Sequence, residues 1–349
     1  MKTIKTFYVT FAFIFLGLVP ILAMGQSMPH TFTANTAAKA SEVNANFKHL
    51  QDQFSLNKKE IDCSSDNLTA TINQGYNHLV IDGNCSVKNL IVGNADINRW
   101  CGYSQANNPI NKLIISGKTG ISSDTLTVNG TGDCDLLSAM DGGYILLENL
   151  TINTTKSILS SGASMMRIEN VNVTGAVDPY IALGSERGSH MHLQNVTTTS
   201  HEVYADRGSM IHLENTTSKD MNITSNGMIE GDNVTVSDLT MDTAGVAEFN
   251  KLTIDCSSAS SACITAYGGT TIKLQNSTIT GNGSTHAISI FGAYLDLKGS
   301  TINSTNSESI KVDYSYISAS TNNTIQGTIK CSQNGLGAFD SAHTTSGCN

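Results

Sequence analysis

Hydrophobic and polar positions alternate along most of the chain in short runs that recur about every twenty residues. Within a run, an apolar residue usually stands two and four positions before an anchor, most often Asn, and the positions one and three before it are mostly polar or charged. Such alternation is typical of a strand with one buried face. The anchors are Asn149, Asn170, Asn195, Asn215, Asn233, Lys251, Asn276 and Gly299, at steps of 18–25 residues.

A step of this length, with no helical period between anchors, predicts a solenoid. We therefore predict an all-β chain that folds as one parallel β-helix of about twelve coils over residues 61–331. At each bend the anchor Asn can take the left-handed conformation, and stacked amides can bond from coil to coil. The predicted structural ladder consists of Asn149, Asn170, Asn195, Asn215, Asn233 and Asn276. It should be interrupted at Lys251 and Gly299, which have no carboxamide.

The repeat resembles the right-handed parallel β-helix family with the pectate-lyase-like fold, whose members carry an asparagine ladder. Segment 61–92 resembles the opening coil of exported bacterial members: Cys63 precedes a short helical stretch, two strands follow, and Cys85 comes after Gly-Asn. The resemblance supports a Cys63–Cys85 disulfide. Enzymes of this fold use a carboxylate-bound Ca²⁺ with a basic residue, or paired carboxylates. The sequence has neither the hydrolases' Asn-Thr-Asp, Asp-Asp and Gly-His cluster nor the lyases' Arg-x-Pro-x-x-Arg.

The beginning of the chain predicts export. Residues 1–25 place Lys2 and Lys5 before an apolar run, as in a secretory signal peptide. An oxidising compartment permits disulfides, so the eight cysteines are expected to pair with sequence neighbours. The expected pairs are Cys63–Cys85, Cys101–Cys134, Cys256–Cys263 and Cys331–Cys348. We expect a secreted or cell-surface protein, with the periplasm as an alternative and no stable membrane span after signal removal.

Two segments flank the predicted β-helix. Residues 26–60 are predicted to form a linker and an amphipathic helix, because apolar residues recur at heptad positions from Val43 to Ile61. The helix would cover the open edge of the first coil. A homotrimer formed through this helix is the alternative. Residues 332–349 are predicted to be a C-terminal tail or cap, closed by the Cys331–Cys348 pair.

Charge restricts the partner classes. The formal net charge of −9 disfavours nucleic acid, whose phosphates require a positive surface. The candidate chemistry lies in two matching stretches, ERGSHMHLQNVT at 186–197 and DRGSMIHLENTT at 206–217. They place His192 and His212 one coil apart, with His190 on the same outward face. Nearby acidic residues Glu230, Asp232, Asp238 and Asp242 show no spacing that specifies a reaction.

Two binding hypotheses follow from these stretches. One is a zinc site at His190, His192 and His212, since stacked coils bring imidazoles to about 5 Å. Solvated histidines are the simpler explanation, and we expect no metal or other cofactor. The other is a groove for an acidic polysaccharide, because guanidinium groups suit carboxylates and tyrosine rings can stack on sugars. Its candidate residues are Arg167, Arg187, Arg207, His190, His192, His212, Tyr180 and Tyr204.

Each arginine has an ordinary alternative role. Arg187 and Arg207 can pair with Glu186 and Asp206 in turns. In the repeat, Arg167 aligns with His192 and not with Arg187, so the arginines form no single column. We favour a non-catalytic exported protein that presents a polar face to a glycan or cell surface, as an adhesin or structural module does. The alternative is a divergent polysaccharide lyase or glycoside hydrolase that acts on an acidic polysaccharide.

Overall fold

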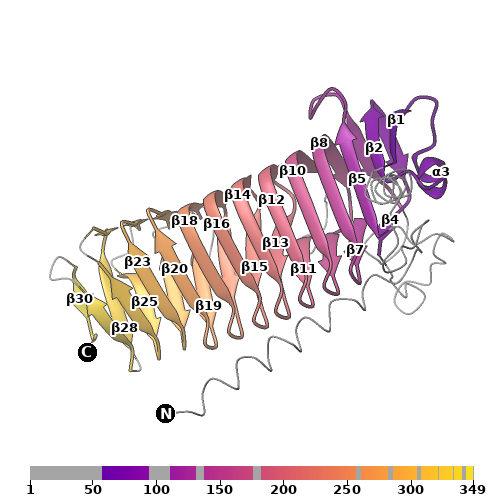
Figure 1. Ribbon diagram of the computed structural model, residues 1–349. Coiled ribbons are helices and arrows are strands. Elements are labelled where there is room, and N and C mark those ends of the chain that lie inside the picture. The colour runs from indigo at the N-terminus through magenta and orange to yellow at the C-terminus, as the bar shows by residue number, and fades with distance from the viewer. Residues whose placement is uncertain are drawn as a thin grey trace, which may run out of the picture. The chain divides into compact units, whose positions relative to one another are not determined.

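The computed structural model describes residues 57–93, 111–130, 137–175, 182–256, 261–281, 286–304, 308–320, 322–332, 334–339 and 343–348. These residues form a parallel β-helix, as predicted (Figure 1). The predicted signal peptide and the expected Cys101–Cys134 pair lie outside the described residues, as does most of segment 26–60. In the described ranges, no helix is long and apolar enough to cross a membrane.

Two sheets form the wall of the β-helix. The larger has 18 strands within the described residues: β1 (Lys58–Asp62), β2 (His78–Asp82), β3 (Asn84–Val87), β5 (Lys112–Gly117), β6 (Thr125–Val128), β8 (Tyr144–Thr154), β10 (Met165–Thr174), β12 (His190–Thr198), β14 (Met210–Thr217), β16 (Met228–Val236), β18 (Val246–Asp255), β20 (Thr271–Gln275), β21 (Thr278–Thr280), β23 (Tyr294–Lys298), β24 (Thr301–Asn303), β26 (Tyr316–Ala319), β27 (Thr324–Ile325) and β29 (Leu336–Phe339).

The smaller sheet has 12 strands in the same ranges. They are β4 (Leu90–Val92), β7 (Leu137–Met140), β9 (Ile158–Ser161), β11 (Ala182–Glu186), β13 (Glu202–Ala205), β15 (Asp220–Ile223), β17 (Asp238–Met241), β19 (Ile264–Tyr267), β22 (Ile288–Phe291), β25 (Glu308–Asp313), β28 (Thr328–Ser332) and β30 (Thr345–Ser346). In the regular middle of the β-helix, a coil runs from a strand of the smaller sheet through a tight turn into a strand of the larger one.

The core lies between the sheets and is built from inward columns. The parallel register places Leu193 opposite Ile168 and Leu213, and all three side chains are fully buried. Burial of one such side chain stabilises the fold by about 1.5–3 kcal/mol. The repeated register therefore turns the alternating sequence pattern into a continuous apolar interior.

The anchor asparagines form the expected bend and ladder. Asn149, Asn170, Asn195, Asn215 and Asn233 all have φ between 47° and 56°. Each amide from Asn170 to Asn233 donates to the anchor of the preceding coil, at 2.8–3.1 Å. At the Asn195 bend, for example, Nδ2 donates to Asn170 Oδ1 over 2.8 Å. The ladder holds the bends of five successive coils together.

The predicted interruption at Lys251 is only partial. Lys251 occupies the bend with φ 60°. Its neighbour Asn250 accepts from Asn276 Nδ2 at 2.9 Å and donates to Asp232 Oδ1 at 2.6 Å. A run of side-chain hydrogen bonds therefore passes Lys251, one residue before the anchor position in each of two coils. The hydrogen-bonded side chains end at Asn276, because Gly299 on the next coil has no side chain to continue them.

The first coil begins earlier than predicted. The heptad pattern places Ile61 at the last position of the predicted helix, but Ile61 lies in β1 and is fully buried. Pairing of β1 with β2 outweighs the heptad pattern at this end, so the helix prediction is wrong for residues 58–61. The rest of the opening coil agrees with expectation: the Cys63–Cys85 disulfide encloses helix α3 (Leu68–Asn73).

The C-terminal residues continue the β-helix. Residues 332–349 were predicted to be a tail or cap, but β29 pairs with β26 and β30 pairs with β28. The Cys331–Cys348 disulfide joins this last turn to the coil before it. A third disulfide, Cys256–Cys263, closes the loop between β18 and β19. The final predicted boundary is therefore wrong, because the last strands still find partners on the preceding coil.

Candidate functional site

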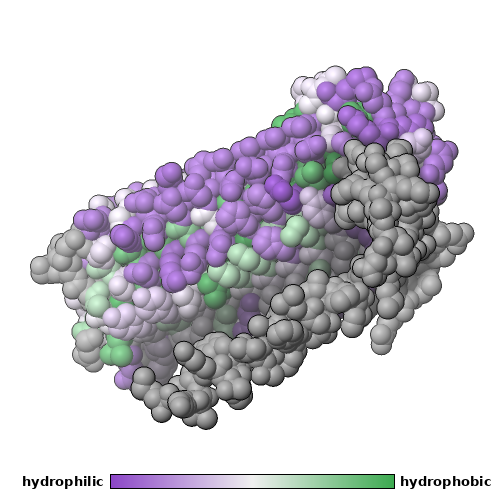
Figure 2. All heavy atoms as spheres, viewed as in Figure 1, coloured by the Kyte–Doolittle hydropathy of each residue, from purple (hydrophilic) through white to green (hydrophobic). Residues whose placement is uncertain are grey.

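The outer face of the larger sheet displays residues in columns, because its strands stack without register shifts from β8 to β23. Three positions before the bend the column reads Arg167, His192, His212, Glu230, Glu248, Lys273 and Asp296. The alignment of Arg167 with His192, and of His192 with His212, agrees with the prediction from the repeat. Figure 2 shows hydrophilic residues gathered along one long edge of the β-helix, with apolar residues interspersed on the face beside it.

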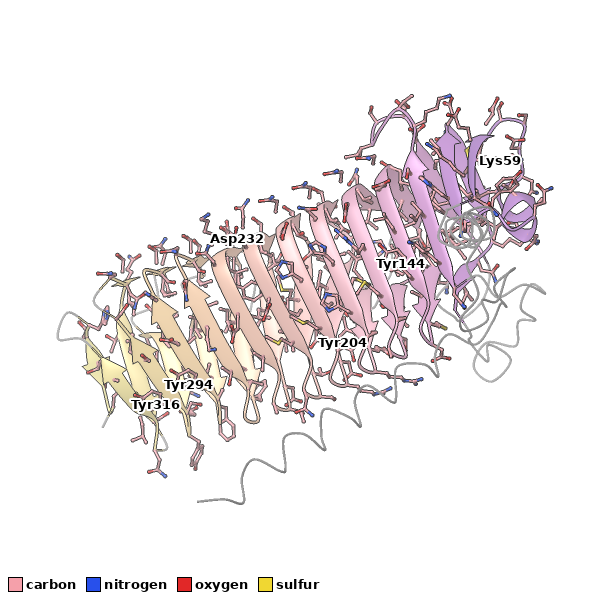
Figure 3. All side chains as sticks on the ribbon, in the orientation of Figure 1. Lys59, Tyr144, Tyr204, Asp232, Tyr294 and Tyr316 are labelled. Carbon is pink, nitrogen blue, oxygen red and sulfur yellow. A yellow bond between two sulfur atoms is a disulfide. The ribbon has the colours of Figure 1, made fainter. Side chains whose placement is uncertain are left out.

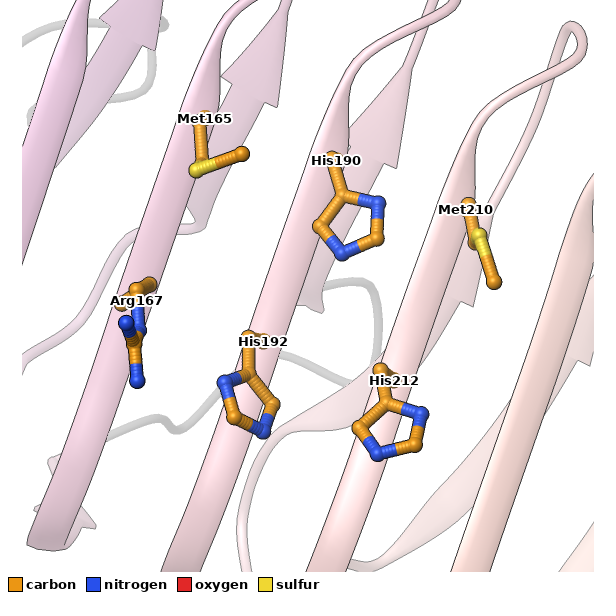
Figure 4. Close-up of a pocket in the computed structure, with 6 residues that line it drawn as sticks. All are labelled: Met165, Arg167, His190, His192, Met210 and His212. Carbon is orange, nitrogen blue, oxygen red and sulfur yellow. The ribbon is translucent and has the colours of Figure 1, made fainter.

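A shallow, open hollow of about 440 Å³ lies on this face (Figure 4). Strands β10, β12 and β14 each contribute two residues to it, at alternate positions. We call it the histidine hollow, and it is lined by Met165, Arg167, His190, His192, Met210 and His212. The structure thus brings together four of the eight predicted binding residues. It adds two methionines that widen the apolar surface around the imidazoles.

His192 and His212 are neighbours on adjacent strands. Their ring centroids are 5.2 Å apart with an interplanar angle of 49°. Glu214 lies beside both rings: its Oε1 is 3.2 Å from His212 Nε2 and 3.9 Å from His192 Nε2. Gln194 donates to the other oxygen, Glu214 Oε2, at 2.7 Å. Two imidazole nitrogens and one oriented carboxylate oxygen therefore converge on one point.

Carboxylates surround the histidine hollow on two sides. Arg167 forms an ion pair with Glu169 on its own strand. Glu230 Oε2 lies 4.0 Å from His212 Nδ1, on the next coil. The positive charge of Arg167 is therefore balanced locally, and this surface favours cations over polyanions.

Burial keeps two of the histidines in the neutral form. It lowers the pKa of His192, and the charges of His212 and Arg167 lower it further. Burial also lowers the pKa of His190, with a smaller contribution from His212. At neutral pH both imidazoles therefore offer an unprotonated nitrogen, which can bind a metal ion or accept a proton.

The other predicted binding residues lie elsewhere. Arg187 and Arg207 stack on adjacent coils in the turns between the sheets, with φ of 53° and 50°, and do not line the hollow. Arg207 Nε pairs with Asp206 Oδ2 at 3.1 Å, as the simpler alternative predicted. Tyr204 lies in the smaller sheet, with its hydroxyl 3.4 Å from Thr224 Oγ1. Tyr180 lies outside the described residues.

A column of mostly apolar residues runs beside the histidines and was not singled out from the sequence. We call it the outer stripe. It contains Tyr144, Met165, His190, Met210, Met228, Val246, Thr271, Tyr294 and Tyr316. Figure 3 labels Tyr144 toward one end of it and Tyr294 and Tyr316 toward the other. The signal was available in the sequence, because these residues stand two positions before the predicted histidine column.

Aromatic rings gather where the outer stripe reaches the last coils. Tyr294 and Tyr316 are stacked with centroids 5.6 Å apart and planes within 5°. Phe291, at the end of β22, and Tyr314, just after β25, meet edge to face at 5.2 Å. Tyr267 pairs with Phe291 in the strand register. We call these five residues the aromatic edge. Tyr267, Phe291, Tyr314 and Tyr316 are 40–52% exposed, which is unusual for large apolar side chains in one place.

The smaller sheet carries a column of three carboxylates on its outer face. Glu202, Asp220 and Asp238 occupy successive coils. Burial raises the pKa of Asp238 to about 6, and the charge of Asp220 adds to the effect. Burial and Asp220 likewise raise the pKa of Glu202, whereas Lys219 lowers it. A protonated carboxyl beside an ionised one is the arrangement that general acid–base pairs use.

No protein-family model matches the chain, and no curated protein matches it significantly. Among solved structures, it is similar to the A-module of the Azotobacter vinelandii mannuronan C-5 epimerase AlgE4, at 12% identity and a TM-score of 0.52. The alignment covers 86% of this chain and 95% of that module. The AlgE6 A-module from the same organism aligns over 85% of this chain and 97% of its own length, at 12% identity and a TM-score of 0.39.

At this identity the AlgE4 likeness establishes the fold alone, and the second TM-score is too low to add to it. The strand registers agree with that likeness, since every pair among the described strands is parallel. The chain therefore has the fold of the parallel β-helix repeat proteins.

Proposed function

We propose that the protein binds a polysaccharide at the aromatic edge and along the outer stripe, without modifying it. The observation that carries the proposal is the exposure of Tyr267, Phe291, Tyr314 and Tyr316 together on successive coils. Large exposed apolar groups in one patch mark interaction surfaces. Aromatic rings offer flat apolar faces and, in tyrosine, a polar tip, which suits the mixed surface of a sugar ring.

Repetition supports a polymeric ligand. Each coil from β8 to β26 offers one residue of the outer stripe, so equivalent positions recur about every 4.7–4.9 Å along the β-helix. A polymer with a short repeat can make the same contact on several coils. The similar AlgE4 module is named for an enzyme of mannuronan, a polysaccharide, which supports the ligand class. The three disulfides support a location outside the cytoplasm.

Contacts between the aromatic rings of the protein and the sugar rings, and not charge pairing, would dominate recognition of the polysaccharide. Arg167 and Arg207 are already paired with carboxylates, so these guanidinium groups offer little to an acidic glycan. We therefore expect binding to vary little with salt, unlike the charge-driven groove expected from the sequence.

Affinity electrophoresis through gels that contain neutral or acidic polysaccharides tests the proposal. We expect retention by at least one polysaccharide, and Tyr316→Ala and Tyr314→Ala should each weaken it by about tenfold. Tyr204→Ala is the matched control, because it removes an equal side chain from the smaller sheet. No retention by any polysaccharide, or equal weakening by the control, would reject the aromatic edge as the binding surface.

A second candidate is a polysaccharide-modifying enzyme, favoured by the carboxylate column. With its pKa raised to about 6, Asp238 can hold a proton near neutral pH beside the carboxyl group of Asp220. The same glycan incubations should be assayed for new reducing ends and for unsaturated or epimerised uronates. Product that appears with the native protein and disappears in Asp238→Asn would replace the binding-only proposal.

A further inference from the structure

We propose that His192, His212 and Glu214 form a binding site for a divalent transition-metal ion such as Zn²⁺. One nitrogen from each ring and one carboxylate oxygen lie within 4.8 Å of one another. Zinc with ligands at 2.0–2.2 Å requires ligand atoms about 3.3 Å apart. The His212 Nε2–Glu214 Oε1 distance of 3.2 Å meets this requirement, and the 3.9 Å distance from His192 Nε2 needs only a small rotation of the side chain.

His192 supplies an independent observation. Its Nε2 is buried and has no hydrogen-bond partner, and Glu214 Oε1 lies 3.9 Å away, beyond hydrogen-bonding distance. A buried polar atom left unpaired costs about 1–3 kcal/mol. A metal ion between His192 and Glu214 would satisfy this nitrogen.

The surroundings of Glu214 resemble the outer shell of a metal site. Gln194 donates to Glu214 Oε2 and so leaves Oε1 directed toward the two rings. Hydrogen bonds of this kind orient ligating carboxylates. Glu230, 4.0 Å from the second nitrogen of His212, adds negative charge that attracts a cation.

The proposed ligand set differs from the three histidines considered from the sequence. His190 lies two residues from His192 along β12, a step of about 6.8 Å, and its partner on the next coil is Met210. Glu214 takes its place because it stands two residues after His212 and reaches both rings. Two imidazoles and one carboxylate favour zinc, copper or nickel over calcium or magnesium. Three protein ligands leave a fourth position of a tetrahedral zinc ion, which water can fill. This proposal does not depend on glycan binding.

Equilibrium dialysis of the purified, tag-free protein against ZnCl₂, followed by metal analysis, tests the site. We expect about one zinc ion per chain and a rise in Tm on zinc addition. His212→Ala and Glu214→Gln should each weaken binding by about tenfold or more. His190→Ala is the matched control, since it removes an imidazole from the same hollow but no proposed ligand. Co²⁺ should give the visible absorption of a low-symmetry site with the native protein and not with His212→Ala.

Far-UV circular dichroism and metal-free Tm values near those of the native protein will show that the variants fold. Stoichiometry well below one, or binding that survives both His212→Ala and Glu214→Gln, would overturn the proposal. Loss of binding in His190→Ala to the same extent as in Glu214→Gln would also overturn it, because the ligands would then be the three histidines.

Discussion

Gly231 lies opposite Phe249 in the inward column of the larger sheet, and the aromatic ring fills the space that a side chain at 231 would need. A Cβ atom added at Gly231 would stand 2.8 Å from Phe249 Cδ1 and 2.7 Å from Val234 Cγ2. The neighbouring coils place Leu193 and Leu213 in this column. The coil of Gly231 thus has no side chain at this position, and the space is occupied by the larger side chain of Phe249 on the next coil.

Gly231→Ala should therefore destabilise the protein by overpacking. We expect a loss of about 1–3 kcal/mol in the free energy of unfolding, measured by denaturant titration. Combining it with Phe249→Leu, which removes the ring that blocks the site, should recover much of that loss. If Gly231→Ala leaves the free energy of unfolding unchanged, the two residues are not complementary in size. The same conclusion follows if Phe249→Leu recovers none of the lost stability.

Lys251→Asn should stabilise the β-helix. Asn tolerates the φ of 60° at this bend better than Lys, and its carboxamide would lie opposite Asn233. The exposed Lys251–Asp232 ion pair, at 4.0 Å, contributes little that would be lost. We expect a gain of about 0.5–1.5 kcal/mol in denaturant titrations. Lys251→Gly separates the effect of backbone strain from that of hydrogen bonding, because glycine adopts the positive φ freely but has no carboxamide. Equal stability of the Asn and Gly variants would show that the new hydrogen bond contributes nothing.

His201 should make the fold sensitive to acid. Its side chain is fully buried, and burial lowers its pKa from 6.5 to about 4. Between these values the unfolded chain binds the proton and the folded chain does not, so stability falls as the pH drops from 6.5 to 4 and levels off below. The loss is of the order of 3 kcal/mol. His201→Gln should unfold more easily at pH 8 yet show a flatter pH profile; an unchanged slope would exclude His201 as the cause.

Asp238→Asn should stabilise the protein near neutral pH. The raised pKa, about 6 against 3.8, means that the folded protein holds this carboxylate at a cost above pH 6. Removing the charge removes that cost, and the benefit should vanish below about pH 4, where Asp238 is protonated in both states. Denaturant titrations of both proteins at pH 8 and pH 3.5 measure the difference. An equal benefit at both pH values would point to packing and not to charge.

Much of the fold could be predicted because its signal is repeated. Asn195 and Asn215 occupy equivalent positions in matching stretches, and their amides meet at 3.1 Å. The partial bridge at Lys251 could not be foreseen, because it depends on the side chain of Asn250 turning toward Asn276. At Ile61 the heptad spacing suggested a helix, but pairing with the next coil decides the structure.

The candidate site was predicted in outline and missed in its details. The repeat aligned His192 with His212 correctly. Glu214 was overlooked because its column was interpreted only as polar, and its approach to the rings depends on the rotamer that Gln194 holds. Tyr314 and Tyr316 lie beyond the last anchor recognised in the sequence, so no repeat position identified them.

The two successive steps of 18 residues, from Asn215 to Asn233 and from there to Lys251, are the shortest in the chain. These coils consist of little besides paired strands and tight turns, and each contacts chiefly the coil on either side. Duplication of such a unit would lengthen the lateral surface without altering its width or the orientation of its columns. In this architecture, the length of the surface that contacts a ligand can therefore change without any change in the residues that make each contact.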